Sequence, residues 1–304
     1  MYSDKKGKVA IILLNYNGAS DTIECIESIK HSVYTNYEII VVDNCSTDNS
    51  VEQLEKYSIN ADFTLIRSKK NNGFSAGNNI GIKDIIKKDF DYVLLLNNDT
   101  LVSPDFLEKL INGFNCSNSC GVTIAKIYYE NDRDIIWYAG GNLNFRTSRT
   151  EHWNYNKKDA FEIKKPCKVS FATGCCMCLS KDVIKKVGLM DEDYFLYEED
   201  ADYCSRILMN GFDIYYIPDS VIYHKVSKST GNASPLSQYY LVRNKYLLIR
   251  KNNKFFNKPI SYMYTTLRFI VRCIKGELKF KYFREAFKAF MKNEIGKSDN
   301  KFLT

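Results

Sequence analysis

The chain has 304 residues, of which 45% are hydrophobic and 26% are charged. This composition is typical of a globular protein and excludes a disordered or fibrous one. The net charge of +7 is unevenly placed, because twelve Lys or Arg residues and only four Asp or Glu residues follow Asn252. A basic C-terminal part on a nearly neutral body indicates an anionic surface as a partner.

The sequence favours a cytoplasmic protein with reduced thiols. Residues 1–8 are polar and charged and lead directly into an apolar run, so we expect no secretory signal there. The ten cysteines include no paired C-x-x-C pattern, so we expect neither a structural zinc site nor disulfides. No stretch reaches about 18 apolar residues without a charge, so we expect no membrane-spanning helix.

Strands and helices alternate through the first 115 residues. Four apolar runs are typical of buried strands, at residues 8–14, 37–42, 63–67 and 92–96. A helical stretch follows each of them, which predicts a parallel sheet wound by right-handed crossovers. We expect Asp21 and Glu24 to form a capping box in the first helix, and Ser103 with Pro104 to begin the fourth.

Polar residues follow three of these strands directly, at 15–17, 43–44 and 97–99. The carboxyl ends of parallel strands bind ligands in open α/β sheets, so we expect these clusters to meet at one edge. Asp99 among neutral amides suits a hard divalent cation that also holds phosphates, although it could merely cap a turn. The glycines of 73–81 lack the G-x-G-x-x-G spacing of an NAD site, but suit a backbone that approaches a nucleotide sugar.

The second half predicts short strands, a loop and two helices. We expect strands at 122–129, 135–139, 143–145, 168–179, 212–217 and 221–224, a mobile loop at 146–165, and a helix at 181–187. Four acids at 198, 199, 200 and 202 open a further helix and exceed what the helix dipole requires, which indicates catalysis or binding. His224 ends an apolar strand and is either structural or a contact to a metal or phosphate.

An ordered set of motifs carries a family resemblance over residues 8–250. The matching pieces are Leu13-Leu14-Asn15-Tyr16-Asn17, Val42-Asp43-Asn44-x-Ser46-x-Asp48, Asn72-Gly73-Phe74-x-x-Gly77-Asn78-Asn79-x-Gly81, Asn97-Asn98-Asp99, Thr173-Gly174, Tyr197-x-Glu199-Asp200-x-Asp202-x-Cys204-x-Arg206, His224 and Tyr239-Tyr240-x-x-Arg243-Asn244. With these motifs the chain resembles the inverting glycosyltransferases of family 2, and more narrowly their bacterial rhamnosyltransferase-like branch, which builds surface polysaccharides.

The resemblance implies a GT-A fold, a Rossmann-like mixed and mostly parallel sheet flanked by helices. It implies a glycosyltransferase domain at 1–250, with a nucleotide-sugar-binding half at 1–115 and an acceptor-binding half at 116–250. Residues 251–304 would then be a basic amphipathic helical extension. The first acid of the family's D-x-D element is Asn97 here, which leaves fewer charges for a metal.

Residue roles also follow from the resemblance. It places the nucleotide sugar at Asn15, Tyr16, Asn17, Asp43, Asn78, Asn98 and Asp99. It places the acceptor at Thr173, Gly174, Glu199 and Arg243, and the general base at Asp200. Clustered acids raise the pKa of one member, which suits a base. Asp99 and His224 would bind Mg²⁺ or Mn²⁺ at the diphosphate.

The implied function is transfer of a sugar, with dTDP-rhamnose as the implied donor, to a hydroxyl of a lipid-linked or growing surface polysaccharide. A nucleotidyltransferase and a catalytically silent carbohydrate-binding protein are the alternatives. The former would be expected to have a Gly-rich loop with basic residues directly after the first strand, where this chain has Asn15-Tyr16-Asn17-Gly18. Nucleic acid is not an expected partner, because the basic residues lie beside an apolar stripe.

The C-terminal stripes have two interpretations. Apolar residues recur at helical spacing at Met263, Leu267, Ile270, Val271 and Ile274, and again at Phe280, Phe283, Phe287 and Phe290. Basic amphipathic helices of this kind lie on the anionic inner face of the plasma membrane, where a lipid-linked acceptor would be met. Alternatively, the stripes pack on the catalytic domain or on a second subunit of a homodimer.

Overall fold

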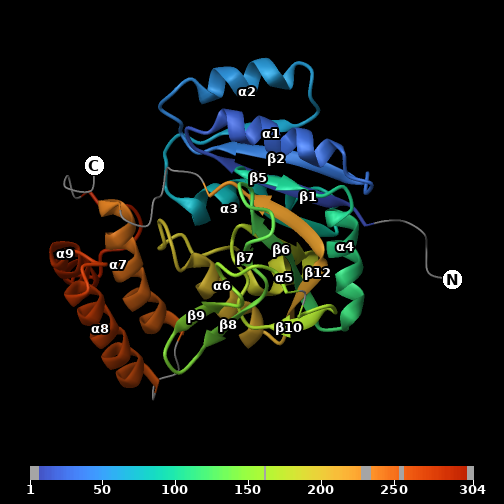
Figure 1. The fold of residues 1–304 in the computed structure, drawn as a ribbon. Helices are drawn as coiled ribbons and strands as arrows, with labels where there is room; N and C mark the ends of the chain where they lie inside the picture. Colours follow the sequence, from blue (N-terminus) through green and yellow to red (C-terminus); the bar gives the residue numbers. More distant parts are fainter. Residues whose placement is uncertain (1–6, 161, 227–233, 253–256, 300–304) are drawn as a thin grey trace.

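The computed structural model describes residues 7–160, 162–226, 234–252 and 257–299. In this part of the chain, a mixed sheet of ten strands has the order β10-β12-β6-β11-β4-β1-β2-β3, with β5 beside β12 and β7 beside β6 (Figure 1). The strands are β1 (Val9–Asn15), β2 (Tyr37–Asp43), β3 (Thr64–Arg67), β4 (Tyr92–Asn97), β5 (Thr100–Val102), β6 (Cys120–Tyr129), β7 (Ile136–Tyr138), β8 (Gly141–Asn144), β9 (Arg149–His152), β10 (Cys167–Val169), β11 (Cys176–Ser180) and β12 (Asp213–His224).

Helices surround this sheet and extend the chain beyond it. They are α1 (Ala19–Lys30), α2 (Ser50–Ser58), α3 (Phe74–Ile85), α4 (Phe106–Gly113), the short 3-10 helix η1 (Phe114–Cys116), α5 (Lys181–Val187), α6 (Glu199–Met209), α7 (Pro235–Asn252), α8 (Lys258–Ile274) and α9 (Phe280–Met291). The predicted mixed α/β sheet, flanked by helices and followed by a helical C-terminal part, is confirmed.

The first half of the sheet is parallel, as its apolar runs predict. β1 pairs with β2 and β4, and β2 pairs with β3. The register sets Asn15 opposite Asp43 and Leu14 opposite Asn97. Because the strands run in the same direction, their polar ends meet at one edge of the sheet, as expected.

The glycines of 73–81 pack the helix against the sheet. A Cβ atom on Gly77 would lie 2.3 Å from a methyl carbon of Leu14, and one on Gly81 would lie 2.8 Å from Ile12. Both glycines belong to α3, and the missing side chains let this helix approach β1 closely. The close packing of α3 on β1 is therefore enough to account for Gly77 and Gly81, and a role for them at a nucleotide sugar stays a prediction.

Two expected helix starts differ in the structure. Asp21 and Glu24 do not form a capping box, because α1 already begins at Ala19; both carboxylates accept instead from the Nζ of Lys225, directly after β12, at 2.9 and 2.7 Å. α4 begins at Phe106 rather than at Ser103, whose hydroxyl donates to the carbonyl of Val221. In both cases, a partner far along the chain replaces the local partner that the sequence suggests.

The second half also departs from the expected strands. The predicted strand 168–179 is two strands, β10 and β11, and Thr173 and Gly174 lie in the break between them. Residues 146–165 include β9, which pairs with β8, so this stretch is not only a loop. β12 joins the predicted strands 212–217 and 221–224, with a register shift at Pro218, which cannot donate to a neighbouring strand.

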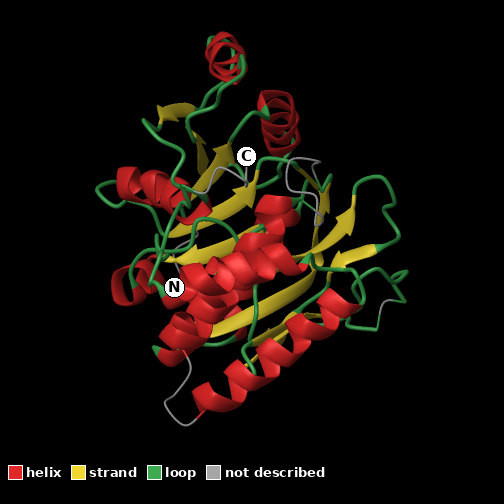
Figure 2. Ribbon diagram, turned by 90° about the vertical axis from the view of Figure 1, so that its left-hand side faces the viewer, coloured by secondary structure: helices red, strands yellow, loops and turns green. Residues whose placement is uncertain are grey.

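The helices α7, α8 and α9 form a second hydrophobic cluster at one side of the sheet (Figures 1 and 2). Tyr246 of α7 lies at its centre, with ring centroids 5.2 Å from Phe287 and 5.3 Å from Phe290. α7 crosses the predicted domain boundary at residue 250 and also contributes Tyr239 and Tyr240 to this cluster. The division into two halves and an extension stays a prediction.

We predict that Gly73→Ala lowers the free energy of unfolding by at least about 3 kcal/mol. Gly73 has a φ of +96°, and a Cβ there would lie 2.0 Å from the Phe195 carbonyl oxygen, so left-handed strain of about 1–2 kcal/mol adds to a backbone clash. Gly211→Ala is the matched control, because its φ is +85° but no atom lies within 4 Å. Urea denaturation measures both, and equal losses would contradict the clash.

Candidate active site

The edge formed by β1, β2 and β4 carries a network of polar side chains. The Asn15 amide donates to the Asp43 carboxylate at 2.8 Å, and the Ser46 backbone N–H donates to the same carboxylate at 3.0 Å. The side-chain oxygen Oδ1 of Asn17 accepts from the Thr47 N–H at 2.8 Å. These bonds fix the two loops that follow β1 and β2. Tyr16, which directly follows β1, has 44% of its surface exposed.

The asparagines predicted to bind a nucleotide sugar lie in different settings. Asn98 belongs to the edge network, because its amide donates to the Thr22 hydroxyl at 2.9 Å. Asn78 is buried in α3, and its amide donates to the carbonyl of Phe74 within the same helix. The structure therefore brings Asn98, but not the Asn78 amide, into the polar network of the edge.

Asp99 and His224 lie side by side at the same edge. The short strand β5 pairs antiparallel with the end of β12 and sets His224 opposite Thr100. This pairing brings the His224 Nε2 within 3.1 Å of an Asp99 carboxylate oxygen, and both residues are buried. The Trp137 ring packs edge-on against the imidazole. Within the described residues, no third His, Cys, Asp or Glu completes a metal cluster here.

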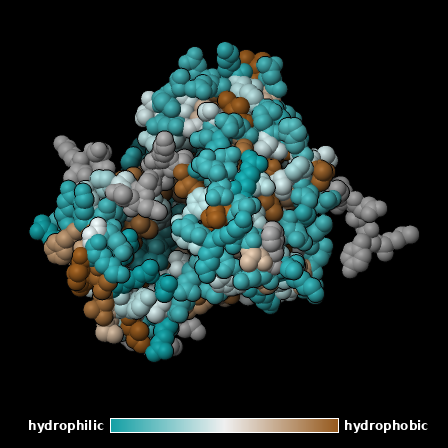
Figure 3. Space-filling view, viewed as in Figure 1, coloured by the Kyte–Doolittle hydropathy of each residue, from teal (hydrophilic) through white to brown (hydrophobic). Residues whose placement is uncertain are grey.

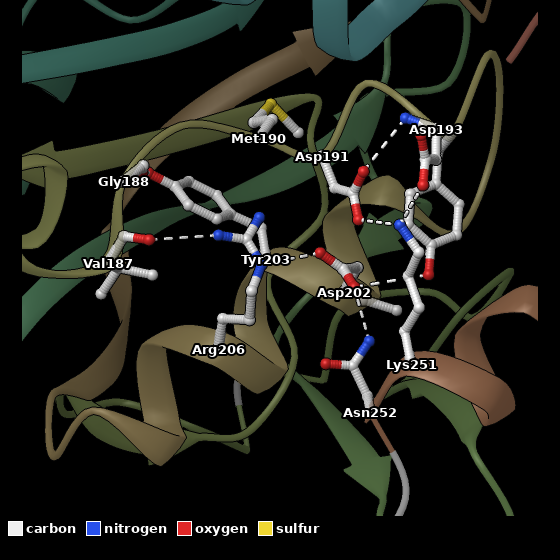
Figure 4. A network of polar contacts seen from close by, with 12 residues as sticks. Val187, Gly188, Met190, Asp191, Asp193, Asp202, Tyr203, Arg206, Lys251 and Asn252 are labelled. Atoms are coloured by element: carbon white, nitrogen blue, oxygen red, sulfur yellow. Dashed lines mark hydrogen bonds and ion pairs between the residues drawn. The ribbon is translucent and has the colours of Figure 1, made fainter.

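Cations from α6 itself and from other elements neutralise most of the acidic segment 191–202 (Figure 4). Lys251 of α7 pairs with Asp191 and Asp193, and Arg206 binds Asp202 at 2.8 Å. Pairs that Figure 4 does not label are Lys83 with Glu192 and Lys245 with Glu198. Among the described cations, none pairs with Glu199 or Asp200. Within the described residues, these two carboxylates are therefore the members of the cluster without an ion pair.

Burial and repulsion perturb both of these carboxyls. Burial, followed by the neighbouring negative charges, raises the pKa of Asp200 to about 6 and that of Glu199 well above its usual range. Asp200 accepts hydrogen bonds from the backbone N–H groups of Gly174, at 3.2 Å, and Ala201, at 2.8 Å. Asp200 is thus oriented by two donors, and its pKa is close to neutral pH, which suits proton transfer.

A left-handed turn precedes this carboxylate pair. Tyr197 and Glu198 have backbone φ values of +69° and +72°, which residues other than glycine rarely adopt. The Asn244 amide donates to the carbonyl of Leu196 at 2.8 Å and to that of Tyr197 at 3.1 Å. Lys245 pairs with Glu198. α7 therefore holds the turn that carries Glu199 and Asp200 into the first turn of α6.

The other side of the acidic segment is held by α3. Asn79 exchanges two hydrogen bonds with the backbone of Met190, at 2.9 and 3.1 Å. The backbone N–H of Phe74 donates to the carbonyl of Phe195 at 3.0 Å. We did not predict Asn79, Asn244 or Lys245 as functional residues. The motifs Asn78-Asn79 and Arg243-Asn244 contained a signal for the two asparagines, but nothing in the sequence paired Lys245 with Glu198.

The predicted acceptor residues are also separated by the structure. Thr173 and Gly174 precede β11, and Gly174 contacts Asp200, so these residues lie with Glu199 and Asp200. Arg243 is only 1% exposed and donates to the carbonyl of Gly296 at 2.7 Å. A side chain enclosed in this way does not reach an acceptor, so the structure argues against that role for Arg243.

Comparisons with known proteins identify the family of the chain. Residues 10–188, more than half of the chain, match the family model "Glycosyl transferase family 2". The chain is 26% identical over 231 residues to the dTDP-rhamnosyl transferase RfbF of Shigella flexneri, covering 72% of each protein. It is 26% identical to the low-salt glycan biosynthesis hexosyltransferase Agl10 of Haloferax volcanii, covering 86% of this chain and 81% of that protein.

A solved structure shows the same fold. The mannosyltransferase PcManGT of Pyrobaculum calidifontis, in complex with GDP-Man and Mn²⁺, superposes with a TM-score of 0.60 at 14% identity. The match covers 96% of this chain and 89% of that protein. At this identity, the likeness concerns the fold alone. The family model covers more than half of the chain, and the sheet carries the polar edge described above. The chain therefore belongs to glycosyltransferase family 2, whose members transfer sugars from nucleotide sugars.

Proposed function

We propose that this glycosyltransferase inverts the anomeric centre of its donor sugar and uses Asp200 as the general base. The observation that carries the proposal is that Asp200 has no described cation partner, accepts from two backbone N–H groups and has a pKa raised to about 6. A carboxylate in this state is a stronger base than an ion-paired one. It remains largely deprotonated at neutral pH.

The proposed reaction requires one proton transfer and one displacement. Asp200 takes the proton of the acceptor hydroxyl, and the acceptor oxygen forms a bond to the anomeric carbon. The bond from that carbon to the diphosphate breaks, and the electron pair leaves with the diphosphate. Attack from the face opposite the leaving group inverts the centre. Gly174 bonds to Asp200, with Thr173 directly before it, and Glu199 is the residue before Asp200. We propose that these three residues contact the acceptor.

The edge network is the proposed site of the nucleotide sugar. The exposed ring of Tyr16 is free to stack on a base, and Asn15 and Asp43 lie next to it at the ends of β1 and β2. Asn17 and Asn98 fix the surrounding loops. The similarity to the dTDP-rhamnosyl transferase RfbF supports dTDP-rhamnose as the donor.

Asp99 and His224 fit a divalent cation, which the structural neighbour binds as Mn²⁺. A carboxylate oxygen and an imidazole nitrogen already face each other, and both atom types bind Mn²⁺ or Mg²⁺ together with phosphate oxygens. When bound there, the cation would neutralise charge on the leaving diphosphate. Two protein ligands leave most coordination positions open, so we propose that tight binding needs the nucleotide.

The proposed acceptor is a hydroxyl of a lipid-linked or growing surface polysaccharide, and the proposed location is the cytoplasmic face of a membrane. No helix among the described residues has the length and hydrophobicity needed to cross a bilayer. The basic C-terminal part supports a peripheral association instead.

We predict that Asp200→Asn lowers kcat at least about 100-fold while nucleotide binding is retained, because an amide cannot accept the proton. Initial rates and calorimetric titration with the nucleotide measure the two effects. Asp202→Asn is the control, because it changes a neighbouring carboxylate that is paired with Arg206. This variant should lose less activity than Asp200→Asn. Near-normal turnover in Asp200→Asn would remove this residue from the base role. If the native protein did not turn over any donor, the alternative of a catalytically silent carbohydrate-binding protein would be favoured.

We predict that log(kcat/KM) falls below about pH 6 with a slope of one, because Asp200 must be deprotonated and its pKa is raised to about 6. Lys245→Met should move this limb to higher pH, since the Lys245 charge lowers the pKa of Asp200 and compensates Glu198. Lys251→Met, whose lysine pairs with Asp191 and Asp193, is the control and should leave the limb in place. A limb that moves equally in both variants would contradict this assignment.

We predict that EDTA abolishes transfer and that Mn²⁺ or Mg²⁺ restores it. Asp99→Asn should raise the Mn²⁺ concentration for half-maximal activity at least about 10-fold, because a carboxylate ligand is lost. Calorimetry should detect tight Mn²⁺ binding to the native protein only with nucleoside diphosphate. Asp105→Asn, which removes a partner of Lys109 on α4, is the control. Full activity in EDTA would exclude a metal role for Asp99 and His224.

A further inference from the structure

The helix α8 has one buried face and one exposed apolar face. Ser261, Thr265 and Phe269 lie on the buried face, which packs toward the rest of the chain. The opposite face carries the stripe Met263, Leu267, Ile270, Val271 and Ile274, whose exposed fractions lie between 41% and 81%. The stripe expected from the sequence is therefore exposed. Of the stripe expected on α9, Phe287 and Phe290 pack against Tyr246 of α7 and Phe283 packs against Phe269 of α8, whereas Phe280 is 63% exposed.

This stripe is extended and lies at the edge of the molecule. It runs over about 16 Å of helix, at about 1.5 Å for each residue. In Figure 3, hydrophobic side chains gather at the lower left, where Figure 1 places α8. Isolated exposed hydrophobic residues are common, but a continuous stripe on one helix face indicates a binding surface.

Cations border the stripe on one side. Arg268, Arg272 and Lys275 line a groove of about 620 Å³ between α7 and α8, together with Tyr155, Leu241 and Val271. Glu277 also lines this groove and lies 3.5 Å from Arg272. α8 itself contains no acidic residue. The apolar stripe and its positive border together form a surface that we name the α8 face.

We propose that the α8 face binds an anionic lipid membrane, with the stripe in the acyl boundary and Arg268, Arg272 and Lys275 at the lipid phosphates. Positive charge beside an apolar helix face complements an anionic bilayer. A second copy docked through the same face would bring two rows of cations together, without acids on α8 to offset them. The inference deepens the proposed function, since a lipid-linked acceptor would be met at this surface.

The test uses the full chain without any substrate, so its outcome is independent of sugar transfer. Flotation with vesicles of phosphatidylcholine containing phosphatidylserine should recover the native protein, and pure phosphatidylcholine should recover much less. High salt should reduce recovery. Leu267→Gln with Ile274→Gln, and separately Arg268→Gln with Arg272→Gln, should each weaken the partition constant at least about 10-fold.

Matched variants control for the loss of apolar surface and of charge elsewhere. Ile59→Gln with Ile86→Gln removes exposed apolar side chains at the ends of α2 and α3. Lys87→Gln with Lys185→Gln removes two exposed cations away from α8. Both control pairs should bind vesicles like the native protein, and thermal unfolding confirms that every variant folds.

Three outcomes would overturn the proposal. The first is unchanged vesicle binding in both α8 variants, and the second is no preference for the anionic vesicles. The third is a dimer in light scattering that Leu267→Gln with Ile274→Gln converts to a monomer, without vesicle binding by the native protein. If the protein binds vesicles but does not transfer sugar, the proposal that the α8 face binds membranes is retained and only the proposed function is rejected.

Discussion

The structure depends on holding seven acids within twelve residues, from Asp191 to Asp202, against their mutual repulsion. The compensating groups come from both sides of the segment. α3 supplies Lys83 and the Asn79 clamp, whereas α7 supplies Lys245 and Lys251. Because the partners belong to elements more than 100 residues apart, the carboxylate pair forms only when the whole domain has folded. What remains uncompensated after this pairing is the pair Glu199 and Asp200, where a raised pKa has a chemical use.

The sequence allowed prediction of those parts of the fold that local patterns determine. β1, β2 and β4 are buried on both faces, so they appear as continuous apolar runs, and their polar ends meet because parallel strands share one edge. Contacts between distant residues were less accessible. β5 has only three residues, too few to show the alternation of apolar and polar residues that marks a strand. Its pairing with β12 nevertheless sets Asp99 beside His224. Lys225, two hundred residues away, likewise decides the role of Asp21 and Glu24.

The stretch 73–81 shows how one pattern can serve two physical needs. Glycine permits close approach, but the sequence does not say whether a ligand or a neighbouring strand approaches. Here Gly77 and Gly81 face Leu14 and Ile12 of β1, and Gly73 adopts a positive φ beside the Phe195 carbonyl. The resulting contact between α3 and Phe195 helps to hold the acidic segment in place. These glycines therefore support the site through packing.

α7 connects the site with the C-terminal surface. Lys245 pairs with Glu198 at the acidic turn, while the next residue, Tyr246, bonds through its hydroxyl to Thr266 of α8 at 2.9 Å. Consecutive residues of one helix thus contact the proposed catalytic segment and the helix that carries the α8 face. A short, packed connection of this kind has little freedom to bend. It would hold Asp200 at a fixed position relative to a bound membrane, which suits an acceptor hydroxyl that its lipid holds at a limited height above the bilayer.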